Sequence, residues 1–356
     1  MKGKFLGNLK HTNVKWLEPA GIAALMVGLP VYLVSDALFK TAILRDNSSS
    51  FLEKKWMKRL LGQMDGCYRK LQRRTKAQKE ESARGLAFDD FKEELEEGRA
   101  WFLAQDKERL TMTSKDGLKL TAYYLPAKIK SEKILILMHG YRNDGYSDFA
   151  GLVKFYHEMG YHLLVPHQRS HGESEGMHIC FGVKERYDLK QWTEYMVKRF
   201  EGNCDVFLSG ISMGGATVLM ATGLELPPQV KGIIADCAFT SAWDMFSCVL
   251  KRDCHLPVFP FLYVADLICR KRAGFGFKEC STISCMKRNQ IPVLFIHGGK
   301  DDFVPMEMSS RNYEACVAKK QFLMIDRAAH GTCNLAEPAV YRSTVMEFME
   351  KCEQGS

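Results

Sequence analysis

The chain has 356 residues, enough for one globular domain of about 250 residues and an N-terminal extension of about a hundred. Hydrophobic residues make up 46% of it and charged residues 26%, which is ordinary for a globular protein. The net charge is +8, but residues 1–85 alone carry 17 lysines and arginines against 7 aspartates and glutamates. The remainder is therefore near neutral, and the basic total does not indicate a nucleic-acid partner.

The first predicted element is an uncharged stretch at residues 19–35. Its length is the lower limit for a membrane-spanning helix, Trp16 and Tyr32 suit a membrane interface, and Asp36 ends the stretch. Lysines both precede and follow it, so the charges do not decide its orientation. We expect residues 1–40 to form a hydrophobic, single-pass membrane anchor. A helix buried in the globular part and a cleaved signal peptide are the alternatives.

Residues 41–108 form the second predicted unit, a helical region with basic and acidic parts. Five apolar side chains line one side of a basic helix there: Leu52, Trp56, Leu60, Leu61 and Met64. Such a helix either lies on an anionic membrane surface or docks on the globular domain with a solvated basic face. Residues 89–97 are acidic and indicate a further helix that leads into the first strand.

Residues 109–356 form the third predicted unit and have an α/β pattern. Residues 109–113 and 118–124 flank an Asp-Gly turn, which predicts an antiparallel hairpin. Further along, short apolar strands alternate with helical stretches, which predicts a mostly parallel central sheet with helices on both faces. Residues 241–290 contain no evident core strand and many apolar side chains, so we expect a helical cap insertion there.

The most informative motif is Gly-Ile-Ser-Met-Gly-Gly at residues 210–215, which follows an apolar strand and precedes a helix-like stretch. A serine that points out of a sharp strand-to-helix turn adopts a strained backbone, and flanking glycines remove the Cβ clashes that would prevent it. The context therefore predicts a nucleophile elbow, with Ser212 at the carboxyl end of a strand and a helix N-terminus behind it.

A serine nucleophile needs a base, and the base needs a carboxylate that fixes its tautomer. After one later strand, a Gly-rich loop carries Asp301, with Asp302 as the competing candidate. After the next strand, a loop of small residues carries His330. The order serine, acid, histidine predicts a triad of Ser212, Asp301 and His330. Asp236 is a rival acid, but it lies one strand too early, and we expect it to brace a loop.

Five motifs in this order resemble the α/β-hydrolase superfamily of serine hydrolases, in particular its serine aminopeptidase-like and cinnamoyl-esterase-like bacterial group. Besides the elbow and the acid and histidine loops, they are a strand that runs into His139-Gly140-Tyr141 and the loop at residues 165–174. The resemblance implies an α/β-hydrolase fold and an oxyanion hole formed by the backbone N–H groups of Tyr141 and Met213. His167 stands where the family has an acid, which puts a structural salt bridge in doubt.

We therefore expect a serine hydrolase that cleaves carboxylic esters or related acyl compounds through an acyl-enzyme, without a cofactor. The apolar cap favours a hydrophobic acyl or aromatic group on a small-molecule substrate. A serine peptidase and a thioesterase or acyltransferase on the same triad are the alternatives within this chemistry. From another class, the alternative is an inactive hydrolase fold that serves as a membrane-tethered binding protein. The sequence does not decide the oligomeric state.

Two further patterns concern metals and location. His162, His167, His171 and His178 lie close in sequence, but Gly172 breaks any helix there and no carboxylate or cysteine completes a tetrahedral set, so we expect no metal. Related proteins commonly carry an N-terminal anchor with the hydrolase outside, so the resemblance implies an extracytoplasmic hydrolase domain. The 12 cysteines, none in a Cys-x-x-Cys pair, suggest a reducing setting instead and leave a cytoplasmic location as the alternative.

Overall fold

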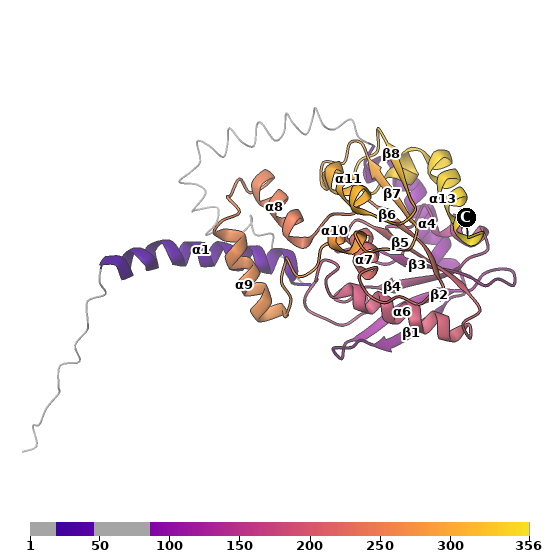
Figure 1. Ribbon diagram of the computed structural model, residues 1–356, viewed down its shortest axis with the longest axis horizontal. Helices are drawn as coiled ribbons and strands as arrows, with labels where there is room; N and C mark the ends of the chain where they lie inside the picture. The colour runs from indigo at the N-terminus through magenta and orange to yellow at the C-terminus, as the bar shows by residue number, and fades with distance from the viewer. Residues whose placement is uncertain (1–18, 46–85, 356) are drawn as a thin grey trace, which may run out of the picture.

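The protein is described by a computed structural model that covers residues 19–45 and 86–355. Its centre is an eight-stranded sheet with the strand order β1-β2-β4-β3-β5-β6-β7-β8 (Figure 1). β2 pairs antiparallel with β1 and β4, and all other neighbours are parallel. The strands are β1 (Glu108–Thr113), β2 (Lys119–Leu125), β3 (Lys133–Met138), β4 (His162–His167), β5 (Asp205–Ile211), β6 (Val230–Asp236), β7 (Val293–Gly298) and β8 (Lys320–Ile325).

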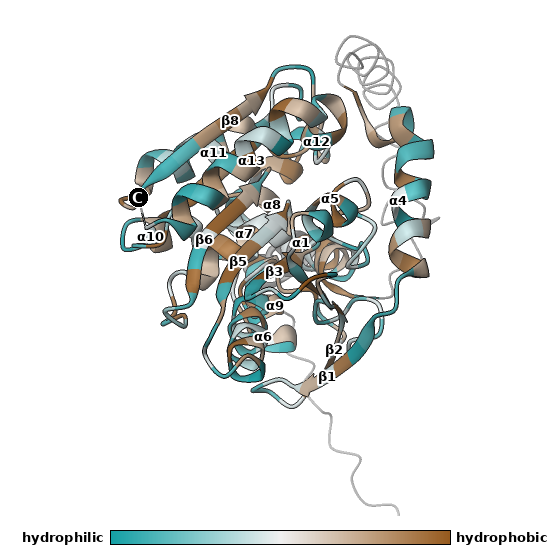
Figure 2. Ribbon diagram, turned by 90° about the vertical axis from the view of Figure 1, so that its right-hand side faces the viewer, coloured by the Kyte–Doolittle hydropathy of each residue, from teal (hydrophilic) through white to brown (hydrophobic). Residues whose placement is uncertain are grey.

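Helices cover both faces of this sheet, as the alternation of strands and helices predicts. They are η2 (Phe88–Phe91), α4 (Lys92–Ala104), α5 (Val153–Glu158), α6 (Glu185–Arg199), α7 (Met213–Ala221), α10 (Thr282–Met286), α11 (Met306–Ala315), α12 (Cys333–Ala336) and α13 (Pro338–Glu353). Successive strand residues point into two separate apolar clusters, so that Leu135 of β3 belongs to one and Ile136 to the other. One cluster contains side chains of α5 and α13, the other those of α6 and α7. Figure 2 shows the hydrophobic strands β5 and β6 inside this arrangement.

The predicted hairpin is present at the edge of the sheet. Glu108–Thr113 and Lys119–Leu125 pair in antiparallel register, with Thr113 opposite Lys119. Gly117 closes the turn with φ +89°, a conformation that favours glycine. The Ser114 N–H donates to the Leu118 carbonyl at 2.8 Å and completes the connection.

The insertion predicted at residues 241–290 is helical. It begins with α8 (Ala242–Arg252) and α9 (Phe261–Ala273), which together form the cap, and ends with α10, which packs against α7 and α11. The Ser241 hydroxyl accepts the Asp244 N–H at 3.0 Å and caps the start of α8. α8 is amphipathic and buries Met245 and Leu250 against the hydrolase side. The α/β-hydrolase fold with a helical cap is therefore confirmed.

The segment predicted as an anchor belongs to one longer helix, α1 (Pro19–Ile43). The C-terminal half of α1 packs on the cap helix α9, and Phe39 and Ile43 are buried there. The Ser35 hydroxyl donates to the Phe261 carbonyl at 2.9 Å, and Asp36 pairs with Arg272. At the last residue of the helix, the Ile43 carbonyl accepts the N–H of Ile179 at 2.8 Å. α1 is thus joined to the hydrolase domain at its C-terminal end.

This arrangement does not support the prediction of a membrane-spanning helix. Within residues 19–45 and 86–355, no helix is long and apolar enough to cross a membrane. Asp36 and Lys40, which follow the uncharged residues 19–35 in α1, form an ion pair at 2.7 Å. The domain boundary placed at residue 40 falls inside α1. The basic helix predicted within residues 52–64 lies outside the described residues, and the acidic residues 89–97 fall in η2 and α4.

Candidate active site

Ser212 occupies the sharp turn between β5 and α7. Its backbone adopts φ 56° and ψ −114°, a conformation that residues other than glycine rarely adopt. Two glycines permit the close packing around it: a Cβ on Gly214 would lie 1.8 Å from the Met138 carbonyl oxygen, and one on Gly210 would lie 2.2 Å from the Gly214 carbonyl oxygen. The Ser212 N–H donates to the Asp236 carbonyl at 2.8 Å. The turn therefore has the geometry of a nucleophile elbow.

The three side chains predicted as a triad lie in one hydrogen-bonded line. Ser212 Oγ lies 2.9 Å from Nε2 of His330, and Nδ1 of His330 lies 2.7 Å from Oδ2 of Asp301. Ser212 follows β5, Asp301 follows β7 and His330 follows β8. Because these strands are parallel within one sheet, their carboxyl ends meet at the same edge. An imidazole that donates from Nδ1 to a carboxylate has Nε2 available to accept the serine proton.

The carboxylate of Asp301 is held from several directions, whereas its competitor Asp302 is exposed. Oδ1 of Asp301 accepts the N–H groups of Phe303 and Val304 at 2.9 and 2.8 Å. Nε2 of His297 lies 3.3 Å from its Oδ2. Although burial raises the pKa of Asp301, the two histidines outweigh it and hold that pKa well below its usual range.

His297, at the end of β7, contacts Ser309 of α11, the Val304 carbonyl and the carboxylate of Asp301. Its Nδ1 lies 2.7 Å from the Ser309 hydroxyl, and its Nε2 lies 3.0 Å from the Val304 carbonyl oxygen as well as near Asp301. The ring is fully buried at the end of β7. His297 thus fixes the loop that carries the acid. The only signal in the sequence was its position before a glycine at a strand end.

The turn after β3 lies against Ser212, where an oxyanion hole was expected. A Cβ on Gly140 would lie 3.4 Å from the Ser212 Cβ, and Tyr141 and Met213 line the same cavity as Ser212. Met213 is the first residue of α7, so its N–H has no acceptor within the helix. Both residues named for the oxyanion hole therefore border Ser212.

Asp148 is a buried carboxyl beside this turn that no sequence signal indicated. Its Oδ2 accepts the Gly140 N–H at 2.5 Å, and the Asn143 amide donates to its other oxygen. Burial raises the pKa of Asp148 to about 6, against the lowering effect of these two hydrogen bonds. Asp148 thus fixes the backbone of the residue that precedes Tyr141.

The loop that carries His167 is held by hydrogen bonds and by ion pairs with acids on other elements, although His167 stands where the family has an acid. Nδ1 of His167 accepts the Glu173 N–H at 3.0 Å, so the imidazole ties down its own loop. Arg169, two residues further, is buried and donates to both carboxylate oxygens of Asp188 on α6 at 2.6 and 2.7 Å. It also donates to both oxygens of Asp116 in the hairpin turn, at 2.8 and 3.0 Å. Arg169 in this loop therefore forms bidentate ion pairs with two acids that are distant in sequence.

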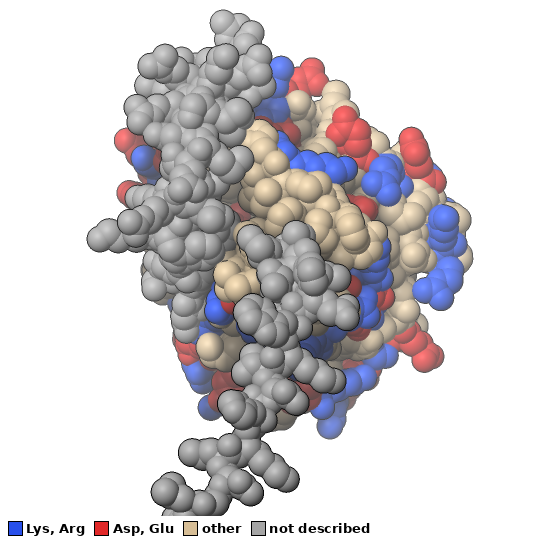
Figure 3. Space-filling view, turned by 90° about the vertical axis from the view of Figure 1, so that its left-hand side faces the viewer, with Lys and Arg blue, Asp and Glu red and all other residues tan. Residues whose placement is uncertain are grey.

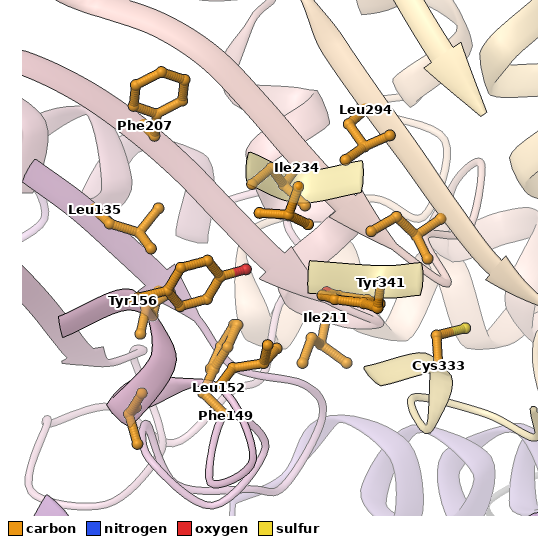
Figure 4. Close-up of a cluster of buried hydrophobic side chains, with 14 of the residues drawn as sticks. Leu135, Phe149, Leu152, Tyr156, Phe207, Ile211, Ile234, Leu294, Cys333 and Tyr341 are labelled. Carbon is orange, nitrogen blue, oxygen red and sulfur yellow. The ribbon is translucent and has the colours of Figure 1, made fainter. Parts of the chain in front are cut away.

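A second buried carboxyl, the rival acid Asp236, lies at the end of β6 beneath the triad. Its side chain is buried, and within residues 19–45 and 86–355 its Oδ1 has no hydrogen-bond partner. Figure 4 shows Tyr156 and Tyr341 in the apolar cluster on this side of the sheet. Burial raises the pKa of Asp236 to about 6, although His297, His330 and the Tyr341 hydroxyl work in the opposite direction. The fold therefore disfavours the ionised form of Asp236, and the side chain is protonated below about pH 6.

Replacing Asp236 with asparagine should stabilise the protein at alkaline pH. A folded-state pKa of about 6 against an ordinary value of 3.8 corresponds to a cost on the order of 3 kcal/mol once the group is ionised. Below pH 4 both the folded and the unfolded chain are protonated there, so the cost is absent. It grows as the pH rises from about 4 to 6 and is complete above that. Urea unfolding of Asp236→Asn and wild type at pH 4.5 and pH 8 measures the difference.

The control for this comparison is Asp302→Asn, which removes an exposed carboxylate in the neighbouring acid loop. It should unfold like the wild type at both pH values. If Asp236→Asn were less stable than wild type by the same amount at both pH values, Asp236 would contribute a hydrogen bond rather than a buried charge.

A cavity of about 420 Å³ opens next to Ser212. Its wall is almost entirely apolar and comes from three sources: the C-terminal half of α1, the cap helices α8 and α9, and the loops beside the triad. Phe181, Phe239, Phe246 and Phe277 are among its lining side chains. Such a cavity suits a hydrophobic acyl or aromatic group and excludes water from the serine.

Potential metal ligands in the described residues gather at the triad itself. Cys237, Asp301 and His330 have ligand atoms within 4.8 Å of one another, and Sγ of Cys237 lies 4.0 Å from Nε2 of His330. However, Asp301 and Nδ1 of His330 already bond to each other, and Nε2 faces Ser212. Burial also raises the pKa of the Cys237 thiol well above its ordinary value, which disfavours the thiolate that a metal requires. The residues fit a hydrolytic triad better than a metal centre.

Comparison with known proteins supports a hydrolase. A model of the serine aminopeptidase family S33 matches residues 129–270, from the strand before the oxyanion turn to the cap. The uncharacterised protein YqkD of Bacillus subtilis is 26% identical over 258 residues, 72% of this chain and 83% of its own length. The uncharacterised membrane protein YNL320W of Saccharomyces cerevisiae is 27% identical over 210 residues, 59% of this chain and 68% of its own.

Solved structures share the fold at low sequence identity. The esterase Pf2001 of Pyrococcus furiosus superposes with a TM-score of 0.58 at 21% identity, over 70% of this chain and 94% of the esterase. The acylaminoacyl peptidase of Pyrococcus horikoshii superposes with a TM-score of 0.52 at 16% identity, over 72% of this chain and 43% of the peptidase. With the eight-stranded sheet, these findings show the α/β-hydrolase fold, and the family match over residues 129–270 supports a serine hydrolase.

Proposed function

We propose that the protein hydrolyses carboxylic esters, with Ser212 as nucleophile, His330 as general base and Asp301 as the residue that orients His330. The observation that carries the proposal is the line of hydrogen bonds from Ser212 Oγ to His330 at 2.9 Å and from His330 to Asp301 at 2.7 Å. A serine hydroxyl is a weak nucleophile on its own, and a neutral imidazole in contact with it removes the proton during attack. The line ends in an apolar cavity that would hold the acyl group.

In the proposed reaction, Ser212 attacks the ester carbonyl while its proton moves to Nε2 of His330. The N–H groups of Tyr141 and Met213 stabilise the oxyanion of the tetrahedral intermediate. The imidazolium gives the proton to the leaving alcohol, and an acyl-enzyme forms. Water then attacks the acyl carbon and gives a proton to Nε2 of His330. As the bond between the acyl carbon and Ser212 Oγ breaks, His330 returns that proton to Oγ and the acid leaves. Asp301 stabilises the imidazolium in both halves, which agrees with the raised pKa of His330 despite its burial.

A serine peptidase is the second candidate, because the matching family model and one structural neighbour are named for peptidases. The cavity beside Ser212 offers little for a charged peptide amine: Asp253 is its one acidic lining residue among those described, and it is exposed. A thioesterase or acyltransferase would use the same site with another leaving group or acceptor. An inactive, membrane-tethered binding protein would leave the hydrogen-bonded triad without a role.

The membrane location stays a prediction, with the hydrolase domain outside the cytoplasm as the expected orientation and a cytoplasmic domain as the alternative. It is supported by the uncharged residues 19–35 and by the name of the yeast relative.

A fluorophosphonate probe, which reacts with activated serines, tests the proposed nucleophile. We expect the purified wild type to be labelled and Ser212→Ala not to be labelled, because Ser309, the other serine beside a histidine ring among the described residues, is fully buried and does not line the cavity. Ser209→Ala is the matched control, since Ser209 lies on the same strand but is not among the residues that line the cavity. p-Nitrophenyl esters of increasing acyl length then give kcat/KM, and the apolar cavity predicts a preference for medium or long chains over acetate.

The outcomes separate the candidates. Absence of labelling in a folded wild type would reject the proposed triad and favour the binding-protein alternative. Labelling that survives in Ser212→Ala would reject Ser212 as the nucleophile and place the activated serine elsewhere. Labelling without ester hydrolysis, but with cleavage of acylaminoacyl p-nitroanilides, would favour the peptidase.

A further inference from the structure

Helix α1 belongs to the candidate active site although it precedes the hydrolase sheet by more than sixty residues. Leu38, Thr41 and Ala42 of α1 line the cavity that contains Ser212. The Tyr141 hydroxyl, next to the oxyanion turn, donates to the Ala42 carbonyl at 2.9 Å. The Arg142 side chain donates to the carbonyl of Leu44, the residue just after α1, at 2.9 Å. The helix is therefore fixed in place as one wall of the cavity.

One face of α1 continues from this wall toward its outer end. Val31, Val34, Leu38 and Ala42 follow each other at intervals of three or four residues, so they lie on one helical face. Val31 and Val34 are partly exposed, while Leu38 and Ala42 line the cavity. An apolar strip thus runs along α1 from the outside of the molecule to the space beside Ser212.

The outer end of α1 presents further apolar side chains. In Figure 1 this end of the helix extends beyond the rest of the described chain. Leu29 and Leu33, one turn apart, are 55% and 44% exposed. Residues 19–35 contain no charge. A protruding helix of this composition is costly in water and favourable against an apolar phase.

The cap helix α9, which packs on α1, adds a second apolar stripe. Phe259, Tyr263 and Leu267 are spaced by four residues on one side of α9 and its approach, and they are 72%, 46% and 64% exposed. The rings of Phe259 and Tyr263 lie 5.6 Å apart. None of the three lines the cavity. Two neighbouring helices therefore carry exposed apolar side chains at the same end of the molecule.

Basic residues border this apolar surface. Residues 241–290 carry eight lysines and arginines against four aspartates and glutamates. Lys251 at the end of α8 and Lys271 at the end of α9 are exposed and form no ion pair within residues 19–45 and 86–355. Figure 3, which views the molecule from the α1 end, shows an area without charged residues, with Lys and Arg as well as some Asp and Glu around it. Apolar side chains bordered by cations suit a bilayer that contains anionic lipids.

We propose that the outer end of α1 and the stripe Phe259, Tyr263 and Leu267 of α9 dock on an anionic lipid bilayer, and that the substrate is an acyl ester drawn from that bilayer along α1. The apolar strip on α1 guides the acyl chain from the lipid phase to the cavity, where its carbonyl reaches Ser212. The substrate part of this inference rests on the proposed esterase function, whereas the docking surface does not.

Binding of the full-length protein to vesicles tests the surface. Phe259→Glu/Leu267→Glu places two charges on the α9 stripe, and Ile129→Glu/Val317→Glu is the matched control, because Ile129 and Val317 are 70% and 60% exposed elsewhere on the molecule. We expect wild type and control to co-sediment with vesicles of phosphatidylcholine and phosphatidylglycerol. The Phe259→Glu/Leu267→Glu protein should bind at least about tenfold more weakly. Pure phosphatidylcholine vesicles should bind the wild type less.

Activity separates this inference from the proposed function. The Phe259→Glu/Leu267→Glu protein should hydrolyse soluble p-nitrophenyl acetate within twofold of wild type, but a long-chain fluorogenic ester embedded in the vesicles about tenfold more slowly. Unchanged vesicle binding, or equal losses in the stripe and control variants, overturns the docking surface and leaves the esterase intact. Vesicle binding as expected, without hydrolysis of either ester, overturns the esterase proposal and the substrate part of this inference but leaves the docking surface.

Discussion

Replacing His330 with alanine is expected to lower kcat for ester hydrolysis by about 10⁶-fold, and replacing Asp301 with asparagine by about 10⁴-fold. Without His330 nothing removes the proton from Ser212 Oγ, to which His330 Nε2 is the neighbour at 2.9 Å. With asparagine at position 301 the ring remains, but an amide replaces the carboxylate that fixes its tautomer and stabilises the imidazolium. Stopped-flow and steady-state hydrolysis of p-nitrophenyl butyrate measure both losses.

Asp302→Asn is the control for Asp301→Asn, because it makes the same chemical change at the next residue, where the side chain is exposed. It should keep kcat within about twofold of wild type. All variants should retain the circular dichroism spectrum of the wild type. A His330→Ala protein that kept a tenth of the activity, or an Asp302→Asn protein that lost as much as Asp301→Asn, would reject this assignment of the base and the acid.

The dependence of kcat/KM on pH tests the same assignment of His330 as base and Asp301 as its partner. Only the neutral imidazole accepts the serine proton, so kcat/KM falls as the pH drops through the pKa of His330. Burial lowers that pKa, but the hydrogen bond and charge of Asp301 outweigh burial and raise it above the ordinary value of 6.5. The acidic limb of wild type should therefore have its midpoint above 6.5. Because Asp301→Asn removes the charge, its midpoint should move to lower pH.

The features that local sequence predicts best are those at strand ends. Ser212, Asp301 and His330 each follow a short apolar strand, and small residues mark each of the three loops. Parallel strands gather their carboxyl ends at one edge, so the order of these loops along the chain was enough to predict their convergence. The cap was predictable for the opposite reason, since residues 241–290 lack any strand pattern between two strands of the sheet.

The supporting residues were not predictable, because their roles depend on contacts between distant segments. Asp148 contacts the turn of Gly140 only because the chain after β3 folds back on itself. Asp188, on a helix, pairs with Arg169 in the loop where His167 stands in place of the family's acid. α1 illustrates the same limit: its uncharged sequence favoured a membrane span, while two partners of its C-terminal half, Phe261 and Arg272, lie more than two hundred residues away.

Replacing Gly214 with alanine is expected to destabilise the protein by at least about 3 kcal/mol or to prevent folding, although alanine favours helices over glycine by about 1 kcal/mol. The new Cβ would lie 1.8 Å from the Met138 carbonyl oxygen, closer than any real Cβ contact, and the atom it meets is backbone. α7 would have to move away from β3, and the turns that carry Ser212 and Tyr141 would separate with it. Urea unfolding and ester hydrolysis should therefore both report the change.

Gly28→Ala makes the same substitution in another helix, and a Cβ on Gly28 would meet nothing within 4 Å. It should leave stability unchanged or raise it slightly. The two variants differ only in the space that surrounds the added methyl group, so their comparison isolates the close approach of α7 to β3. If Gly214→Ala unfolded at the same urea concentration as Gly28→Ala, the elbow would owe its glycine to something other than this contact. If it lost stability as expected, the glycine after Met213 is a requirement of the packing of α7 against β3, and that packing also fixes the position of the Met213 N–H proposed for the oxyanion hole.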